Sequence, residues 1–158
     1  MAFVRKNRAL EEKVRVRRES TLLLNANRQV IFANQAFQDQ FSIEDPATLY
    51  GCRPGEILGC RHAGEGEGGC GTSEHCRCCH GVHAILSSLR DSPDIQRCSI
   101  QIKDRSEPLA FLILTVPVTI HRFSCILVEL AGAELENSEN FGRQILGLQR
   151  LVAEIEGA

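Results

Sequence analysis

The order of the apolar segments predicts an α+β fold for this chain of 158 residues. Two short strand-like segments come first, and a Cys- and Gly-rich stretch, an amphipathic helix and three longer strands follow. Apolar residues at helical spacing also mark both ends of the chain. With 43% hydrophobic and 24% charged residues, the composition is typical of a globular protein large enough to bury a core. One domain flanked by amphipathic helices is therefore expected.

The first elements are predicted by short local patterns. An N-terminal helix is indicated by four residues at spacings of four, three and four: Phe3, Asn7, Leu10 and Val14. Two apolar strand segments, Thr21–Leu24 and Gln29–Ala33, are joined by the Asn-rich turn 25–28. Asn34 stands where a helix N-cap is expected, ahead of a helical stretch that contains Phe37.

The later elements follow a Gly-rich interruption. Residues 51–71 hold eight of the thirteen glycines, so regular structure should largely lapse there. The next helix, over residues 76–89, has one apolar face: Val82, Ile85, Leu86 and Leu89. Three strands are then expected, at about Ile95–Lys103, Ala110–Ile120 and Phe123–Leu130. The second is almost continuously apolar and should lie inside the sheet, with a bulge or an edge at Pro117.

The C-terminal helix repeats apolar residues at spacings of four and three: Phe141, Ile145, Leu148, Val152 and Ile155. A small domain cannot readily cover such a terminal stripe, and the N-terminal stripe of Phe3, Leu10 and Val14 poses the same problem. Leaving both stripes in water is unfavourable, because a large apolar side chain gains roughly 1.5–3 kcal/mol on burial. A homodimer that pairs the terminal helices is therefore predicted.

Charge and segment patterns exclude several classes of protein. No run approaches the roughly 20 apolar residues of a membrane span, and no export signal is visible, so a cytoplasmic protein is expected. The basic residues of segment 1–20 are interleaved with acids, and the chain has no Trp and one Tyr, which argues against nucleic-acid binding. No nucleophile–base motif or phosphate loop is present, so we do not predict an enzyme.

Six of the eight cysteines lie between Cys52 and Cys79. In the cytoplasm thiols stay reduced, so clustered cysteines indicate metal or redox chemistry rather than disulfides. Soft thiolates held close together are the ligands of zinc and of iron–sulfur clusters. A thiol redox switch and inert core packing are the alternatives.

Residues 22–37, Leu-Leu-Leu-Asn-Ala-Asn-Arg-Gln-Val-Ile-Phe-Ala-Asn-Gln-Ala-Phe, resemble the opening hairpin of the PAS family, which ends in an Asn-x-Ala-Phe helix start. A subset of bacterial sensor PAS domains also carries Arg-Pro-Gly-Glu, Gly-Cys-x-His-Ala and Gly-Cys-Gly-Thr-Ser-x-x-Cys-x-x-Cys, which correspond here to residues 53–56, 59–63 and 69–79. The resemblance implies a PAS-like five-stranded antiparallel sheet with helices on one face, used in sensing. The chain then divides into an N-terminal helix (1–19), a sensor domain (20–131) with a Cys-rich insert (51–80), and a dimerisation helix (132–158).

Matching the motif residue by residue selects four metal ligands: Cys60, Cys70, Cys76 and Cys79. If helical, the last two are three residues apart and project from one face. An iron–sulfur cluster is preferred to zinc, because only one short Cys-x2-Cys spacing exists and clusters tolerate irregular spacings. His62 belongs to the same motif and is predicted to donate a hydrogen bond to a thiolate ligand.

The remaining candidates are alternates. Cys52 could replace one ligand or act as a resolving thiol, and His80 and His83 could join Cys76 and Cys79 in a mixed zinc site on one helical face. The other three cysteines are predicted to pack in the core: Cys78, Cys98 and Cys125. Residues 76–80 also spell the Cys-x-x-Cys-His motif of c-type haem. That cofactor is not expected, because it is attached after export and the family-like pattern usually has Gly at position 80.

The sequence therefore predicts a cytoplasmic PAS sensory module with a four-cysteine metal centre that responds to oxygen or redox state. Gain or loss of the centre would alter the packing of the 76–89 helix and reach the terminal helices of a dimer. A histidine kinase or another signalling partner would supply the output. A structural zinc beside a small-molecule pocket, and a metal-free dimerisation module, are the alternatives.

Overall fold

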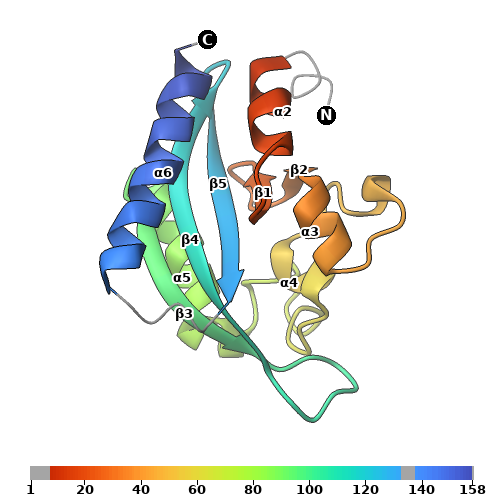
Figure 1. Ribbon diagram of the computed structural model, residues 1–158. Helices are drawn as coiled ribbons and strands as arrows, with labels where there is room; N and C mark the ends of the chain where they lie inside the picture. The colour runs from red at the N-terminus through yellow and green to blue at the C-terminus, as the bar shows by residue number, and fades with distance from the viewer. Residues whose placement is uncertain (1–7, 133–137, 158) are drawn as a thin grey trace.

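A computed structural model describes residues 8–132 and 138–157, and it confirms the α+β prediction. Its five strands form one antiparallel sheet in the order β2-β1-β5-β4-β3 (Figure 1). The strands are, in chain order, β1 Ser20–Leu24, β2 Val30–Ala33, β3 Asp94–Ile100, β4 Leu109–Ile120 and β5 Phe123–Gly132. The N-terminal hairpin and the three later strands are thus joined into one sheet, because β1 pairs with β5.

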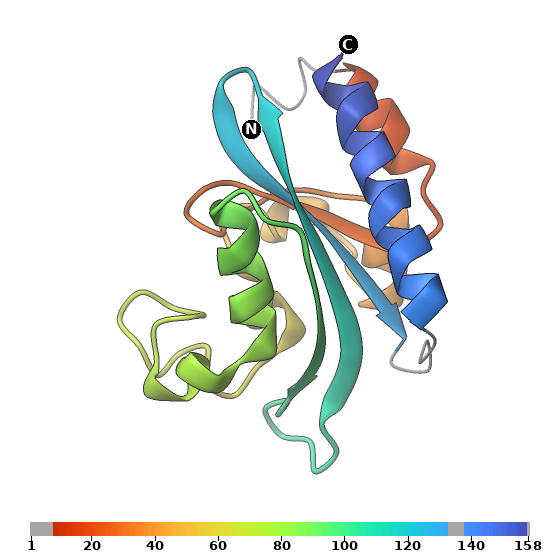
Figure 2. The same ribbon diagram turned by 90° about the vertical axis from the view of Figure 1, so that its left-hand side faces the viewer.

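Helices cover both faces of this sheet. The inner face, as we call the side that carries the cysteine-rich segment, packs against α3 Gln35–Gln40, α4 Pro54–Leu58 and α5 His80–Leu89, with single turns η1 Pro46–Thr48 and η2 Glu74–Cys78 between them. The outer face is covered by α2 Arg8–Arg15 and α6 Ser138–Glu156, which lie beside each other (Figure 2). No helix in the described ranges has the length and apolar character needed to cross a bilayer.

The predicted cap at Asn34 is confirmed and does more than begin α3. Its side-chain oxygen accepts hydrogen bonds from the main-chain N–H groups of Phe37 and Thr21, each at 3.0 Å. Its amide nitrogen donates to the carbonyl of Glu19 at 2.8 Å. One buried residue therefore fastens the start of α3 to the start of β1, which explains why Asn follows the hairpin.

The position of Pro117 agrees with the predicted edge. Strand β3 pairs with β4 only as far as Asp94 opposite Thr115, so the end of β4 has β5 alone as its neighbour. A residue without an N–H group is tolerated where one side of a strand is unpaired.

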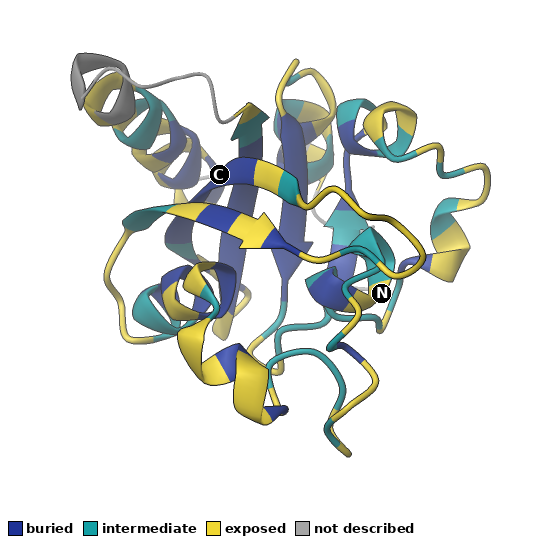
Figure 3. Ribbon diagram, turned by 90° about the horizontal axis from the view of Figure 1, so that it is seen from below, coloured by how far each residue is buried: buried dark blue, intermediate teal, exposed yellow. Residues whose placement is uncertain are grey.

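Two hydrophobic clusters lie on opposite sides of the sheet, because successive side chains of a strand point to opposite faces. Figure 3 shows most of the sheet buried between the helical layers, whereas the edge strand β3 is mainly half-buried or exposed. On β5, Val128 and Leu130 belong to the inner cluster, and Leu127 belongs to the outer one. Glu129 also points to the outer side, where its carboxylate meets the Arg17 guanidinium at 2.6 Å.

The described parts of both terminal stripes are buried within one chain, so the expectation that a small domain cannot cover them is wrong. The outer cluster takes up Leu10 and Val14 of α2 and four residues of α6: Leu148, Leu151, Val152 and Ile155. Lys13 bonds Glu154 at 2.8 Å and holds the two helices together. The outer face of the sheet is itself apolar, and α2 and α6 cover it. The helix patterns alone could not show this. Phe3 and Asn7 lie outside the described residues, as does the side chain of Phe141.

Candidate functional site

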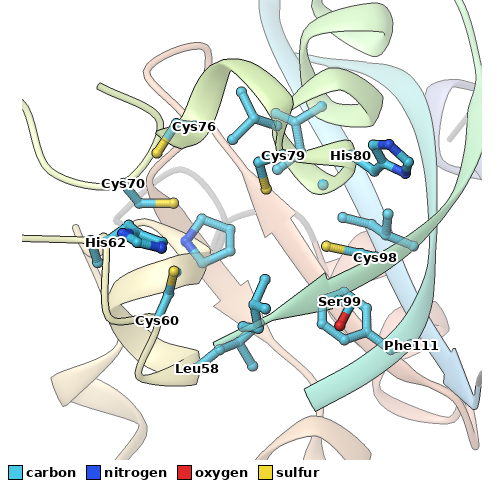
Figure 4. Close-up of a pocket in the computed structure, with 18 of the residues that line it drawn as sticks. Leu58, Cys60, His62, Cys70, Cys76, Cys79, His80, Cys98, Ser99 and Phe111 are labelled. Carbon is cyan, nitrogen blue, oxygen red and sulfur yellow. The ribbon is translucent and has the colours of Figure 1, made fainter. Parts of the chain in front are cut away.

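A cavity of about 560 Å³ lies between the inner face of the sheet and the cysteine-rich segment. Apolar side chains of the strands, among them Leu22, Ile113 and Val128, form its floor. The loops and the start of α5 form its walls and contribute most of its cysteines (Figure 4). The cysteines along it are Cys60, Cys70, Cys76, Cys78, Cys79 and Cys98.

The structure brings the four predicted ligand cysteines to this cavity. In Figure 4 the sulfur atoms of Cys60, Cys70, Cys76 and Cys79 lie around the same part of the cavity. They come from three places: the end of α4, the Gly-rich loop, and the turn η2 with the residue after it.

The thiols influence one another electrostatically. Burial, together with negative charge on Cys76, Cys79 and Cys60, raises the pKa of Cys70 to about 11. Burial likewise raises the pKa of Cys60, with a contribution from Cys79 and Cys76. Thiolates so placed disfavour one another in the absence of a cation. A bound cation would remove that repulsion.

The Arg-Pro-Gly-Glu motif builds one wall of the cavity, beginning with Arg53. Its Nε donates to the Asn27 carbonyl at 3.1 Å, and its Nη1 donates to the carbonyls of Gly68 at 2.7 Å and Cys70 at 3.0 Å. One guanidinium therefore fastens the cysteine loop to the β1–β2 turn. Pro54 follows as the first residue of α4, a position that suits its missing N–H group.

The last two residues of the motif control how closely the loop approaches α4. A Cβ atom on Gly55 would lie 2.5 Å from the sulfur of Cys70, so only glycine leaves room for that thiol. Glu56 bonds back to the main-chain N–H of Arg53 at 3.3 Å and closes the first turn of α4. Gly69, whose φ of +82° favours glycine, passes directly over the Glu56 carboxylate.

The predicted helix over residues 76–89 is interrupted, which corrects the expected geometry. Cys76 lies in the 3₁₀ turn η2, Cys79 is extended with ψ of 116°, and α5 begins only at His80. The shared helical face on which the mixed zinc site was based is therefore absent. His80 Nδ1 instead contacts the Arg97 carbonyl at 2.8 Å, and His83 Nε2 contacts the Arg77 carbonyl at 2.6 Å.

Two other cysteine predictions are confirmed and one is wrong. Cys98 and Cys125 are buried, the latter on the outer side of the sheet. Cys78 is exposed, because it lies in η2 and not on the apolar face of α5. Cys52 is partly buried, and its sulfur contacts the Thr48 carbonyl at 3.5 Å.

Cys98 has a second role that the sequence analysis missed. A hydrogen bond with Cys98 lowers the pKa of Cys79 and raises that of Cys98, with further help to the Cys79 thiolate from the N–H groups of Val82 and Gly81 at the start of α5. A Cβ on Gly81 would lie 3.3 Å from the Cys98 sulfur and 3.7 Å from the Cys79 sulfur. The alternation of β3 places Cys98 on the same face as Ile100, a signal that was present in the sequence.

Arg28 is the second residue that was missed. Its guanidinium lies against Gly71, and its pKa is lowered by burial and by Arg53, whereas Cys70 and Cys76 raise it. A fixed positive charge beside these thiols favours their ionised form. No local pattern could show this, because the contact joins the β1–β2 turn to a loop more than forty residues away.

His62 is placed differently from the expectation. Its main-chain N–H donates to the Cys60 sulfur, which lowers the pKa of that thiol, whereas its ring Nδ1 contacts the Glu65 carboxylate at 2.9 Å. Ring donation to a thiolate stays a prediction.

The spacing of the donor atoms tests which group fits the cysteines. Within the described ranges, three or more His, Cys, Asp or Glu ligand atoms lie within 4.8 Å of one another only at His62, Glu65 and His75. No three of the four cysteine sulfurs therefore lie within 4.8 Å of one another. Four sulfurs at 2.3 Å from one tetrahedral zinc would be roughly 3.8 Å apart. A cluster holds its cysteines further apart, because several iron atoms and sulfides lie between them.

We expect Arg53→Gln to loosen the cysteine loop. The variant loses charged hydrogen bonds to the carbonyls of Gly68 and Cys70, each worth on the order of 1 kcal/mol. Hydrogen exchange of the main-chain amides in residues 66–72 should accelerate, while exchange in β4 and β5 stays unchanged. Arg61→Gln, an exposed change in the same segment, is the control. Unchanged exchange in the loop would contradict this role of Arg53.

Comparison with solved structures identifies the fold. The LOV protein of Rhodobacter sphaeroides superposes with a TM-score of 0.62 at 12% identity, over 93% of this chain and 79% of that one. The PAS domain of nitrogen regulation protein NR(II) from Vibrio parahaemolyticus gives 0.51 at 15% identity, over 77% and 94%. The PAS domain of BvgS from Bordetella pertussis gives 0.51 at 11% identity, over 87% and 91%. No family model and no curated protein matches the chain. The protein has the PAS fold.

Proposed function

We propose that this PAS-fold protein is a sensory module whose input is a metal centre held by Cys60, Cys70, Cys76 and Cys79, with an iron–sulfur cluster as the preferred group. The observation that carries the proposal is the convergence of these four thiols on one cavity. Their mutual charge effects favour a bound cation. The cluster is preferred to zinc because the sequence has only one short Cys-x2-Cys spacing and no three of the sulfurs lie within 4.8 Å of one another. Such a group supplies one-electron redox chemistry or sensitivity to oxygen.

The chain's own residues would hold the centre and tune it. Arg28 places positive charge beside Cys70 and Cys76, which offsets the negative charge of thiolate ligands. Cys98 and the N–H groups at the start of α5 favour the thiolate form of Cys79. The apolar floor of the cavity limits contact with water, and this shields a redox centre from solvent.

Strand β5 offers a route from the cavity to the terminal helices. Val128 and Leu130 line the cavity, and Glu129 between them pairs with Arg17, which lies two residues after the end of α2. A change in the cavity that displaces β5 would therefore also displace the Arg17–Glu129 pair. The outer helices would then pass the change to a partner, such as a histidine kinase or another signalling protein.

A second function is supported by the size of the cavity. About 560 Å³ with mostly apolar walls is enough for a small molecule, as in typical ligand pockets. In that function the cysteines would bind a structural zinc that rigidifies the loops, or no metal. We propose it as the alternative. With the sensory function we also propose a cytoplasmic location, a non-enzymatic role and a homodimer. Among the described residues, the exposed apolar side chains that such a dimer could bury include Leu146 of α6.

The proposal predicts that single Cys→Ser changes at positions 60, 70, 76 and 79 each abolish metal retention. A serine hydroxyl is a poor ligand for soft metals, and one lost thiolate opens the site. The measurements are metal content, acid-labile sulfide and visible absorption of anaerobically purified protein. Cys78→Ser is the matched control, because Cys78 is exposed in the same segment, and it should retain the metal.

Three outcomes would decide against parts of this proposal. If two or more of the four variants keep the metal, the ligand assignment is wrong. A colourless protein with one equivalent of zinc would favour the structural-zinc alternative. Thiols that titrate freely in protein with no metal would favour a ligand-binding or dimerisation module.

A further inference from the structure

A second set of metal-type donors lies at the rim of the cavity, apart from the thiols. His62 Nδ1 is 2.9 Å from Glu65 Oε1, and His75 Nδ1 is 3.1 Å from Glu65 Oε2. The two imidazole rings stack, with centroids 4.1 Å apart and an angle of 11° between their planes. The ligand atoms of all three residues lie within 4.8 Å of one another.

We propose that His62, Glu65 and His75 bind one divalent transition-metal ion of the zinc type. Two imidazole nitrogens and a carboxylate oxygen are the protein ligands of open zinc sites, in which water completes the coordination. Nitrogen ligands favour Zn²⁺, Cu²⁺ or Ni²⁺ over Mg²⁺ and Ca²⁺, which prefer oxygen. The site does not depend on the cysteine centre, because none of its donors is a thiol.

Local structure brings the three side chains together before any ion binds. His62 and Glu65 are three residues apart in a turn closed by a hydrogen bond from the Glu65 N–H to the His62 carbonyl, at 3.2 Å. His75 lies ten residues further, in η2. Each oxygen of the Glu65 carboxylate contacts one imidazole ring. The ion therefore binds ligands that are already partly assembled. The loss of side-chain entropy that opposes binding is correspondingly smaller.

The ion would connect the two segments that carry the cysteines. His62 is two residues after Cys60, and His75 directly precedes Cys76. Both histidines also line the cavity, so an ion between them lies at its mouth. Its binding would fasten the 62–65 turn to η2 and restrict access to the cavity. Since the side chains of Glu65 and His75 are 42% and 64% exposed, the ion can exchange with solvent.

The test is a titration of the full chain, purified anaerobically, with Zn²⁺, followed by calorimetry and by NMR of the imidazole nitrogens. We expect the resonances of His62 and His75 to shift together as one equivalent binds. Glu65→Gln and His75→Gln should each weaken binding at least about tenfold, because each removes a protein ligand. Glu67→Gln, an exposed acid two residues away, is the matched control and should bind as the unaltered protein does.

The two metal proposals can fail separately. A Cys70→Ser variant that has lost the cysteine centre should still show the paired histidine shifts on addition of Zn²⁺. If instead Zn²⁺ leaves His62 and His75 unshifted, or if Glu65→Gln binds as tightly as Glu67→Gln, the histidine site is wrong. In that case the two hydrogen bonds to Glu65 are the whole role of the cluster.

Discussion

Gly55→Ala should empty the cysteine site while the fold remains intact. The new Cβ would lie 2.5 Å from the sulfur and 3.1 Å from the Cβ of Cys70, so Cys70 must move. It would also lie 3.5 Å from the Cβ of Cys60, which limits movement in that direction. Alanine favours a helix over glycine by about 1 kcal/mol, so α4 itself gains. We expect metal retention to fall at least about tenfold, as when a group that positions a ligand is lost.

The matched control is Gly64→Ala, at a glycine of the same segment. A Cβ there meets no atom within 4 Å, and the residue has no positive φ. Metal content and visible absorption report on the site, and far-UV circular dichroism reports on the fold. If the Gly55→Ala protein holds as much metal as the Gly64→Ala protein, then Cys70 is not a ligand in the geometry described here.

Arg17→Met should destabilise the protein more than any surface change. The Glu129 side chain is 2% exposed and has Arg17 as its ionic partner at 2.6 Å. Removing one partner of a buried pair leaves an uncompensated charge and lowers the free energy of unfolding by roughly 3–5 kcal/mol. Denaturant unfolding at neutral pH measures this loss. Arg18→Met, an exposed neighbour, should change the free energy of unfolding by less than about 0.5 kcal/mol.

The effect of Arg17→Met should depend on pH in a definite direction. Burial raises the pKa of Glu129, Arg17 lowers it, and Glu19 raises it, so that the pKa lies above its usual range. Without Arg17 the folded-state pKa rises further. A raised folded-state pKa contributes stability below the unfolded pKa and loses it as pH rises through the folded pKa. The variant should therefore be closer to the unaltered protein near pH 4.5 than at pH 8.

A double variant separates charge from packing. Arg17→Met with Glu129→Leu replaces the ion pair by apolar groups, and such replacements are often neutral or stabilising. We expect it to recover most of the stability lost in Arg17→Met and to lose the pH dependence. Equal losses in the single and double variants would mean that the Arg17 side chain acts through packing alone.

The sheet and helix α3 could be predicted because they depend on short patterns. The hairpin 21–33 and the cap at Asn34 are set by residues within a few positions of one another. The alternation of β3 likewise indicates that Cys98 lies on the same face of the sheet as Ile100. Elements of this kind can be predicted from one sequence, since their main contacts are local.

The shape of the cysteine segment could be predicted only in part. The motif match selects thiols that do come to one cavity, but the helix break at Cys79 and the exposure of Cys78 were missed. The loop is positioned by Arg53 and Arg28, which contact it from distant parts of the chain. Helical periodicity also shows that a helix has an apolar face without showing what covers it, and this is why the burial of α2 and α6 on the sheet was missed.

The packing of α6 on the outer face limits which movements of this helix are possible. Four of its side chains, Leu148, Leu151, Val152 and Ile155, are each less than 10% exposed. At roughly 1.5–3 kcal/mol for each, detaching the helix into water would require on the order of 6–12 kcal/mol. That range overlaps the roughly 5–15 kcal/mol that stabilises a whole domain. In the function proposed for this domain, a movement of α6 must therefore slide or rotate the helix on the sheet, or exchange the sheet for another apolar surface in the same step.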